Sequence, residues 1–148
     1  MQKVQLFCVG RLKEKFYTDA CAEYEKRLSR YCTLEVTELP ETGDIEKDGA
    51  ALLARIPSGA YVVALCIEGK SYSSEELAAL FSDCASSGRS RLVFLIGGSD
   101  GLSPAVKVRS DVRLSMSRMT FPHHLARVMA LEQIYRAFTI CEGGKYHK

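Results

Sequence analysis

The sequence contains no apolar segment that could span a lipid bilayer. Charged residues interrupt every hydrophobic run well before the roughly 20 residues that a transmembrane helix needs. The first residues also lack the apolar block and small-residue cleavage site of a signal peptide. We therefore expect a cytoplasmic protein without a membrane partner. The 148 residues, 47% hydrophobic and 26% charged, predict one folded domain over residues 1–148.

Several motifs of well-known chemistry are also missing. No Cys-x-x-Cys pair occurs and no His, Asp or Glu group has ligand-like spacing, so no metal is expected. Neither the Gly-x-Gly-x-x-Gly of dinucleotide-binding enzymes nor the glycine-lysine loop of P-loop proteins is present. Five cysteines in apolar surroundings are interpreted as buried free thiols, namely Cys8, Cys21, Cys66, Cys84 and Cys141.

The net positive charge of the chain is small, but it is unevenly distributed along the sequence. The net charge is only +2, yet residues 102–148 hold 8 Lys and Arg against 3 Asp and Glu. Because this basic excess coincides with polar loops, it favours an anionic partner such as nucleic acid.

The hydrophobic pattern alternates strands with helices. Short apolar or alternating runs predict five strands, at residues 3–9, 33–39, 60–67, 91–96 and 112–115. Apolar positions three and four apart, bounded by caps, prolines or glycines, predict helices at about residues 14–31, 45–56, 73–86, 104–109 and 123–140. The order predicts an α/β fold with a mostly parallel five-stranded sheet and helices on both faces.

Ligands of such sheets bind at the carboxyl ends of the strands. Gly97 and Gly98 follow a buried strand, and glycine lets the backbone approach a ligand closely. For an isolated Gly-Gly pair, the favoured interpretation is merely a tight exit from the strand. The loop at residues 116–121 contains two methionines and a phenylalanine, which either line a slot for a flat ring or pack onto the last helix.

The last helix carries several polar residues near its start. The helix dipole disfavours protonation of His123 and His124, so a neutral histidine there could accept a proton, although such residues more often only hydrogen-bond to neighbours. Arg127 is expected on the same face as His123, where the two could hold a phosphate or carboxylate. Glu132 and Arg136, also four apart, predict an ordinary ion pair.

The segment Gly143–Lys148 ends the sequence with Tyr146, His147 and Lys148 after two glycines. It is either a frayed end or a hinged segment whose side chains handle protons or phosphate.

Six segments in the same order resemble the ribosomal RNA large-subunit methyltransferase H family, a minimal branch of the SPOUT methyltransferases. They are Val9–Lys15, Glu23–Leu28, Ile96–Gly101, Ser117–His123, Glu132–Phe138 and Gly143–Lys148. The resemblance covers nearly the whole chain. It departs from the family at Thr42–Glu46, which is shorter than in many relatives, and at His124, which replaces a more common polar residue.

The resemblance implies an enzyme that transfers a methyl group from S-adenosyl-L-methionine to N3 of a pseudouridine in helix 69 of 23S rRNA. It also implies a homodimer with a C-terminal trefoil knot, an exception to the rule that chains do not thread loops. Because the chain has no separate RNA-binding domain, we expect it to act on assembled ribosomes rather than on free RNA. Apolar residues of the last helix beyond one buried face also favour a dimer, namely Met129, Ile134 and Phe138.

Carried over by position, the cofactor site consists of Leu65, Gly97, Gly98, Met116, Ser117, Arg118, Met119, Thr120 and Phe121. Tyr146 and His147 would reach the active site formed with the partner subunit. We expect His147 or His123 to take the proton of the acceptor nitrogen. The arginines expected to contact phosphate or a developing oxyanion are Arg118, Arg127 and Arg136.

Two other functions compete with this prediction. The first is a non-catalytic ribosome-associated RNA-binding factor, which would not transfer a methyl group. The second is a phosphate-handling hydrolase that uses His123 and Arg127. It lacks a matching nucleophile in the sequence and should ignore S-adenosylmethionine.

Overall fold

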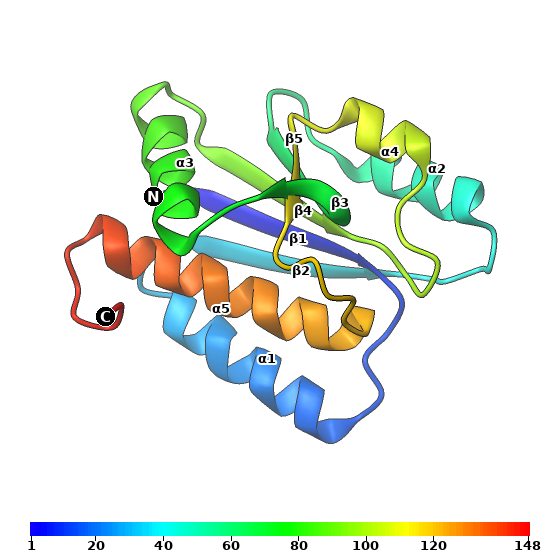
Figure 1. Cartoon of the computed structure of the whole chain (residues 1–148), viewed down its shortest axis with the longest axis horizontal. Coiled ribbons are helices and arrows are strands. Elements are labelled where there is room, and N and C mark those ends of the chain that lie inside the picture. Colours follow the sequence, from blue (N-terminus) through cyan, green and yellow to red (C-terminus); the bar gives the residue numbers. More distant parts are fainter.

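The computed structural model describes all residues, from Met1 to Lys148, and contains one five-stranded sheet (Figure 1). Its strands lie in the order β2-β1-β4-β3-β5, and every neighbouring pair is parallel. This arrangement confirms the predicted α/β class. The strands are β1 (Lys3–Val9), β2 (Thr33–Leu39), β3 (Tyr61–Ser71), β4 (Arg91–Ile96) and β5 (Val112–Ser115).

Five helices connect or follow the strands, at the predicted places. Ser73 and Glu76 form the predicted capping box at the start of one helix, and Ser103 caps another ahead of a proline. The first helix ends three residues earlier than predicted, where the Ser29 hydroxyl donates to the Lys26 carbonyl. The helices are α1 (Lys15–Leu28), α2 (Ile45–Arg55), α3 (Ser74–Ser86), α4 (Pro104–Arg109) and α5 (His123–Cys141). None of them combines the length and apolar character needed to cross a membrane.

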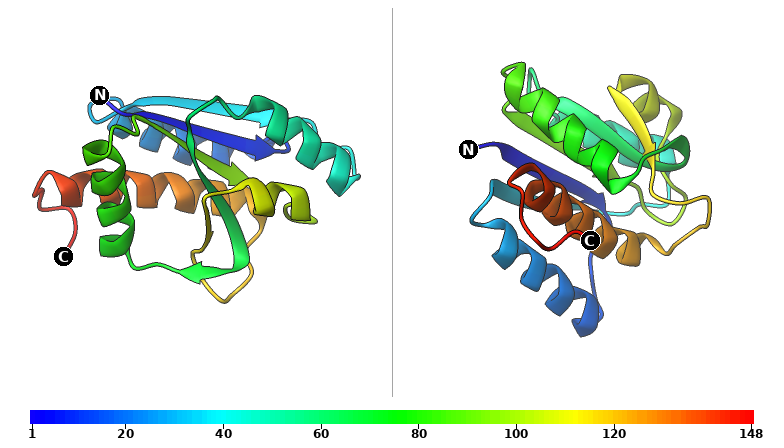
Figure 2. Two further views of the ribbon diagram at one scale, coloured as in Figure 1. Left: turned by 90° about the horizontal axis from the view of Figure 1, so that it is seen from above. Right: turned by 60° about the vertical axis from the view of Figure 1, so that its left-hand side comes forward.

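Helices cover both faces of the sheet (Figure 2). Because side chains alternate along a strand, Leu6 and Cys8 of β1 join the core under α1, α3 and α5. Their neighbours Phe7 and Val9 join the core under α2 and α4. In this fold α5 packs against both α1 and α3, so the last helix closes one face.

The strand β3 runs beyond its predicted end, and its pairing register with β5 shifts there. It pairs regularly with β5 up to Leu65 and resumes at Lys70 after an irregular segment. A Cβ atom on Gly69 would lie 2.7 Å from the Arg113 carbonyl carbon, so the two chain segments pass very close to one another. The trefoil knot stays a prediction.

Two expectations about buried side chains were wrong. Of the five cysteines predicted to be buried, Cys66 is only half-buried, and Cys141 is exposed because it is the last residue of α5 and lies beyond the core. Ile134 and Phe138 are buried in the core of their own chain, against the sheet and α3, and are not left over for a second subunit. Met129, the third residue of that prediction, is only half-buried, so it alone remains available to a second subunit, and the homodimer stays a prediction.

Candidate active site

The glycine turn after β4 is one wall of the site. A Cβ atom on Gly97 would lie 2.9 Å from Gly101 Cα and closer still to the Gly101 carbonyl group. Gly98 and Gly101 form an isolated bridge, in which the Gly101 amide donates to the Gly98 carbonyl at 3.0 Å. Gly101 has a φ of 81°, which favours glycine. The turn is therefore the tight exit that one interpretation required, and it also faces the site.

Glu41, just after β2, holds this turn in place. One carboxylate oxygen accepts hydrogen bonds from the Ser99 amide at 2.8 Å and the Ser99 hydroxyl at 2.7 Å. These bonds hold the pKa of Glu41 below its ordinary value, because they stabilise the ionised form. Sequence reasoning missed Glu41. The only signal was an acidic residue at the carboxyl end of a strand, the edge at which ligands bind.

A cleft of about 720 Å³ opens between the glycine turn, the irregular part of β3 and the loop after β5. Its volume is typical of small-molecule sites. Eight of the nine predicted cofactor residues line this cleft: Leu65, Gly97, Gly98, Met116, Ser117, Met119, Thr120 and Phe121. The ninth, Arg118, is exposed and does not line it.

The loop between β5 and α5 is held in shape by hydrogen bonds within itself, and its Met116 also packs against the core that α5 covers. The Ser115 hydroxyl donates to the Ser117 carbonyl at 2.9 Å, and the Met119 amide donates to the Ser117 hydroxyl at 3.0 Å. Met119 is 74% exposed, whereas Met116 is half-buried and lines the cleft. The arrangement favours the interpretation of a slot for a ligand.

The charges around the cleft are acidic or paired. Lys107 forms an ion pair with Glu68, and Asp100 has no ion-pair partner. Glu41 lies behind the glycine turn and adds a further negative charge. Among the residues that line the cleft, the only basic side chain besides the paired Lys107 is the neutral His123. The cleft therefore suits a ligand with a cationic centre better than a phosphate.

His123 lies at the rim of the cleft, 3.8 Å from Glu41 through Nε2. Its pKa is lowered, mainly because partial burial penalises the charged ring and further because His124 is adjacent. Neutral His123 has a nitrogen free to accept a proton, as one prediction required. His124 instead points toward Glu14, with 3.8 Å between Nδ1 and a carboxylate oxygen.

Arg127 is not available to hold a ligand, contrary to the prediction. The residue is only 3% exposed, and its guanidinium donates to a Glu38 carboxylate oxygen at 2.6 Å and to the Gly10 carbonyl at 3.0 Å. These contacts tie α5 to the ends of β1 and β2. Sequence spacing placed Arg127 beside His123 but could not show that the side chain turns inward.

The C-terminal segment folds back onto α5 and α3 (Figure 1). The Tyr146 hydroxyl donates to a Glu132 carboxylate oxygen, and Arg136 forms the predicted ion pair with Glu132 at 3.1 Å. This hydrogen bond is the main reason why the pKa of Tyr146 is raised to about 12, so its phenol stays protonated. The segment is therefore not a frayed end.

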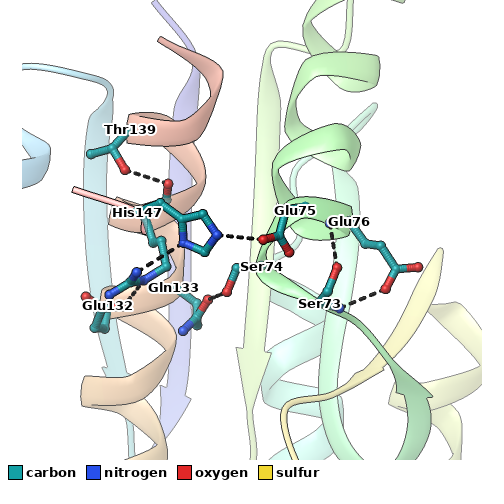
Figure 3. Close-up of polar contacts among 9 residues, drawn as sticks. Ser73, Ser74, Glu75, Glu76, Glu132, Gln133, Thr139 and His147 are labelled. Carbon is teal, nitrogen blue, oxygen red and sulfur yellow. Dashed lines mark hydrogen bonds and ion pairs between the residues drawn. The ribbon is translucent and has the colours of Figure 1, made fainter. Parts of the chain in front are cut away.

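His147 bridges the two helices, as Figure 3 shows. Its Nδ1 lies 3.1 Å from Arg136 and its Nε2 lies 2.6 Å from Glu75, at the start of α3. Because a guanidinium only donates, Nδ1 accepts from Arg136, and the proton of the neutral ring lies on Nε2 and points to Glu75. Both ring nitrogens are occupied. Sequence reasoning missed Glu75, which no motif distinguished from an ordinary first-turn acid.

The two histidines do not meet within one chain. His123 begins α5 and Arg136 follows 13 residues later, which corresponds to about 20 Å along the helix. A second cavity of about 330 Å³ lies between α3 and α5 and shares three wall residues with the cleft, namely Leu65, Leu114 and Met116. No group of three His, Cys, Asp or Glu side chains lies close enough together to hold a metal ion.

Comparison with known proteins identifies the family and the fold. The sequence model of the family described as predicted SPOUT methyltransferase matches residues 2–147. The chain belongs to this family. Two relatives are each called ribosomal RNA large subunit methyltransferase H and align with 98% of this chain and 99% of their own length. That of Clostridioides difficile is 48% identical and that of Listeria monocytogenes 47%.

A solved structure shares the fold at much lower sequence similarity. A probable methylase family protein from Haemophilus influenzae superposes with a TM-score of 0.59 at 11% identity, over 98% of this chain and 70% of that one. The family match places the cleft in a methyltransferase scaffold. It confirms the family that the six sequence segments indicated.

Proposed function

We propose that this protein uses S-adenosylmethionine to methylate N3 of a pseudouridine in helix 69 of 23S rRNA, acting on assembled ribosomes in the cytoplasm. The observation that carries the proposal is the glycine-walled cleft in a chain that aligns end to end with relatives named for rRNA methylation. We further propose that residues 1–148 form one domain and that the enzyme works as a homodimer.

The residues of the cleft fit this cofactor. Leu65 and Met116 offer apolar surface for an adenine ring, and the glycine turn brings backbone groups close to a ligand. The acidic and paired side chains suit the positive charge of a sulfonium group. When bound, the cofactor supplies an electrophilic methyl group. Residues of the cleft wall, such as Leu65, Met116 and the glycine turn, would hold the cofactor, and fixing its position would lower the entropic part of the reaction barrier.

Removal of the N3 proton is the step for which this chain must supply a base. His123 is the base that is free in the observed arrangement, because it is neutral and makes no hydrogen bond. His147 becomes a base only after it leaves Arg136 and Glu75, because both of its nitrogens are engaged. The C-terminal segment of one subunit acting in the cleft of its partner would bring the two histidines together.

The side chains of Arg118 and Arg136 have different roles in this proposal. Arg118 is exposed beside the cleft and has no ion-pair partner, which suits contact with an RNA phosphate. Arg136 is engaged by Glu132 and His147 and lies over the Tyr146 ring, 4.6 Å from its centre. Arg136 therefore positions the C-terminal segment before any contact with substrate.

The test uses radiolabelled S-adenosylmethionine and ribosomes from a strain that lacks the modification, followed by mass spectrometry of the labelled RNA. We expect label on one pseudouridine of helix 69, on ribosomes and not on an isolated hairpin. Cofactor binding without transfer would favour the non-catalytic factor instead. Efficient methylation of the free hairpin would contradict the ribosome requirement, and light scattering that shows only monomers would contradict the homodimer.

A further inference from the structure

A second polar hollow lies at the opposite edge of the sheet from the cleft. It has a volume of about 590 Å³ and lies among the loops that precede β3, β4 and β5, at residues 58–60, 88–91 and 109–111. In Figure 1 these loops lie along the upper edge, whereas the glycine turn lies at the lower right. Arg91 begins β4 and Gly97 follows its end, so the hollow and the cleft are about 20 Å apart.

Three arginines line this hollow, which we call the arginine notch: Arg89 in the loop before β4, Arg91 at the start of β4 and Arg109 at the end of α4. None of them forms an ion pair with a carboxylate. Arg89 lies over the Tyr61 ring, 5.5 Å from its centre, at the boundary between this hollow and a neighbouring one that Tyr61 lines. The arginine notch is therefore a concentration of uncompensated positive charge.

One acidic residue lines the arginine notch, and its carboxylate already has a structural role. Asp111 accepts a hydrogen bond from the Val62 amide at 2.8 Å, across the start of β3. Its single charge leaves the three arginines with a net positive balance. Ser58 and Ser90 add hydroxyl groups to the wall, so the lining consists of donors suited to phosphate oxygens.

The cleft offers no comparable positive charge. Its one lysine, Lys107, is paired with Glu68, and Asp100 adds a negative charge. An RNA substrate carries a negative charge on each phosphate, and most contacts that orient nucleic acid go to the backbone. Arg118 at the edge of the cleft can supply one phosphate contact, and an enzyme with an otherwise acidic cleft needs further contacts elsewhere on the surface.

We infer that the arginine notch binds the phosphate backbone of the ribosomal RNA about 20 Å from the methylated base. The inference rests on the proposed function, which supplies the polyanionic substrate. Arginine suits this role because its planar group donates in pairs to phosphate oxygens. Two contact points so far apart match an extended RNA surface better than a short hairpin, which gives a physical reason for dependence on the assembled ribosome.

The test compares the intact protein with a variant carrying Arg89→Ala, Arg91→Ala and Arg109→Ala. A matched control removes three exposed charges away from the arginine notch, through Lys13→Ala, Lys26→Ala and Lys47→Ala. Methyl transfer to undermethylated ribosomes is measured at several salt concentrations, and the affinity for S-adenosylmethionine is measured by calorimetry. Filter binding to protein-free large-subunit RNA at low salt measures the RNA contact without the reaction.

For the arginine variant we expect KM for ribosomes to rise about tenfold or more, with kcat and cofactor affinity unchanged. The slope of log KM against log salt should flatten by about two to three, since each lost phosphate contact removes about 0.7–0.9. The lysine control should stay close to the intact protein. Equal KM values for the arginine variant and the intact protein would overturn the inference.

Filter binding distinguishes contact with RNA from contact with a ribosomal protein. A raised KM for ribosomes with unchanged binding to protein-free RNA would overturn the inference in favour of contact with an acidic ribosomal protein. If the intact protein transferred no methyl group at all, the proposed function would fail, and filter binding alone would still test the arginine notch. Loss of RNA binding by the arginine variant would support the notch in that case.

Discussion

Adding one methyl group to the glycine turn should disable the cleft, and we predict this for Gly97→Ala. The new Cβ would lie 2.9 Å from Gly101 Cα and closer to the carbonyl, all of which is backbone. Ordinary contact requires about 3.5 Å, so the turn would have to open by about 1 Å. Overpacking of this kind costs about 1–3 kcal/mol, and rigid backbone on the far side places the expected loss near the upper value.

The same displacement moves one wall of the proposed cofactor site. A misplacement of about 1 Å can lower the rate about 100-fold, and we expect a loss of that order in methyl transfer together with weaker cofactor binding. Calorimetry with S-adenosylmethionine and urea unfolding measure the two effects separately. Both should appear in Gly97→Ala.

Gly98→Ala is the matched comparison. A Cβ atom on Gly98 would lie 2.7 Å from Glu41 Cδ, a side-chain atom that can shift by rotation, although the shift weakens the hydrogen bonds from Ser99. We therefore expect a loss of about 1–2 kcal/mol, with a smaller effect on cofactor binding than in Gly97→Ala. Wild-type affinity and stability in Gly97→Ala would refute the argument that close backbone approach requires glycine there.

Three more predictions follow from single contacts. Arg127→Met should lower the free energy of unfolding by about 2–3 kcal/mol, because it leaves the Glu38 carboxylate without its partner. The loss stays moderate because Glu38 keeps some access to water, and urea unfolding measures it. The lowered pKa of His123 means that the unfolded chain binds the proton more tightly than the folded protein. Stability should therefore fall as the pH drops below about 6.5. In melting curves recorded at several pH values, His123→Gln should remove this part of the pH dependence. His147→Ala should lower kcat about 100-fold or more and leave cofactor affinity unchanged, as single-turnover kinetics and calorimetry can measure; equal losses in both would contradict a catalytic role.

Most of the fold could be predicted from the sequence, because local signals and hydrophobic patterns agreed. After Arg91 the run Leu92–Ile96 is apolar throughout, as expected for a strand covered on both faces, and the bounds of β4 (Arg91–Ile96) were predicted to the residue. The start of α3 was equally clear, since Ser73 and Glu76 form a capping box within four residues. Where the pattern weakened, the prediction failed. The exposed half of β3 has no core face, and its pairing with β5 could not be inferred locally.

The sequence by itself determined the α/β class, the order of the elements and the loops that form the cleft, because short-range chemistry specifies each of them. Only the tertiary structure decided which side chains face one another. Arg127 turned inward to Glu38, Glu41 came to hold the glycine turn, and His147 reached Glu75 across two helices. These partners lie far apart in the chain, up to 89 residues for Arg127 and Glu38. Their contacts depend on how the strands order in the sheet and how α5 packs, which no local pattern encodes.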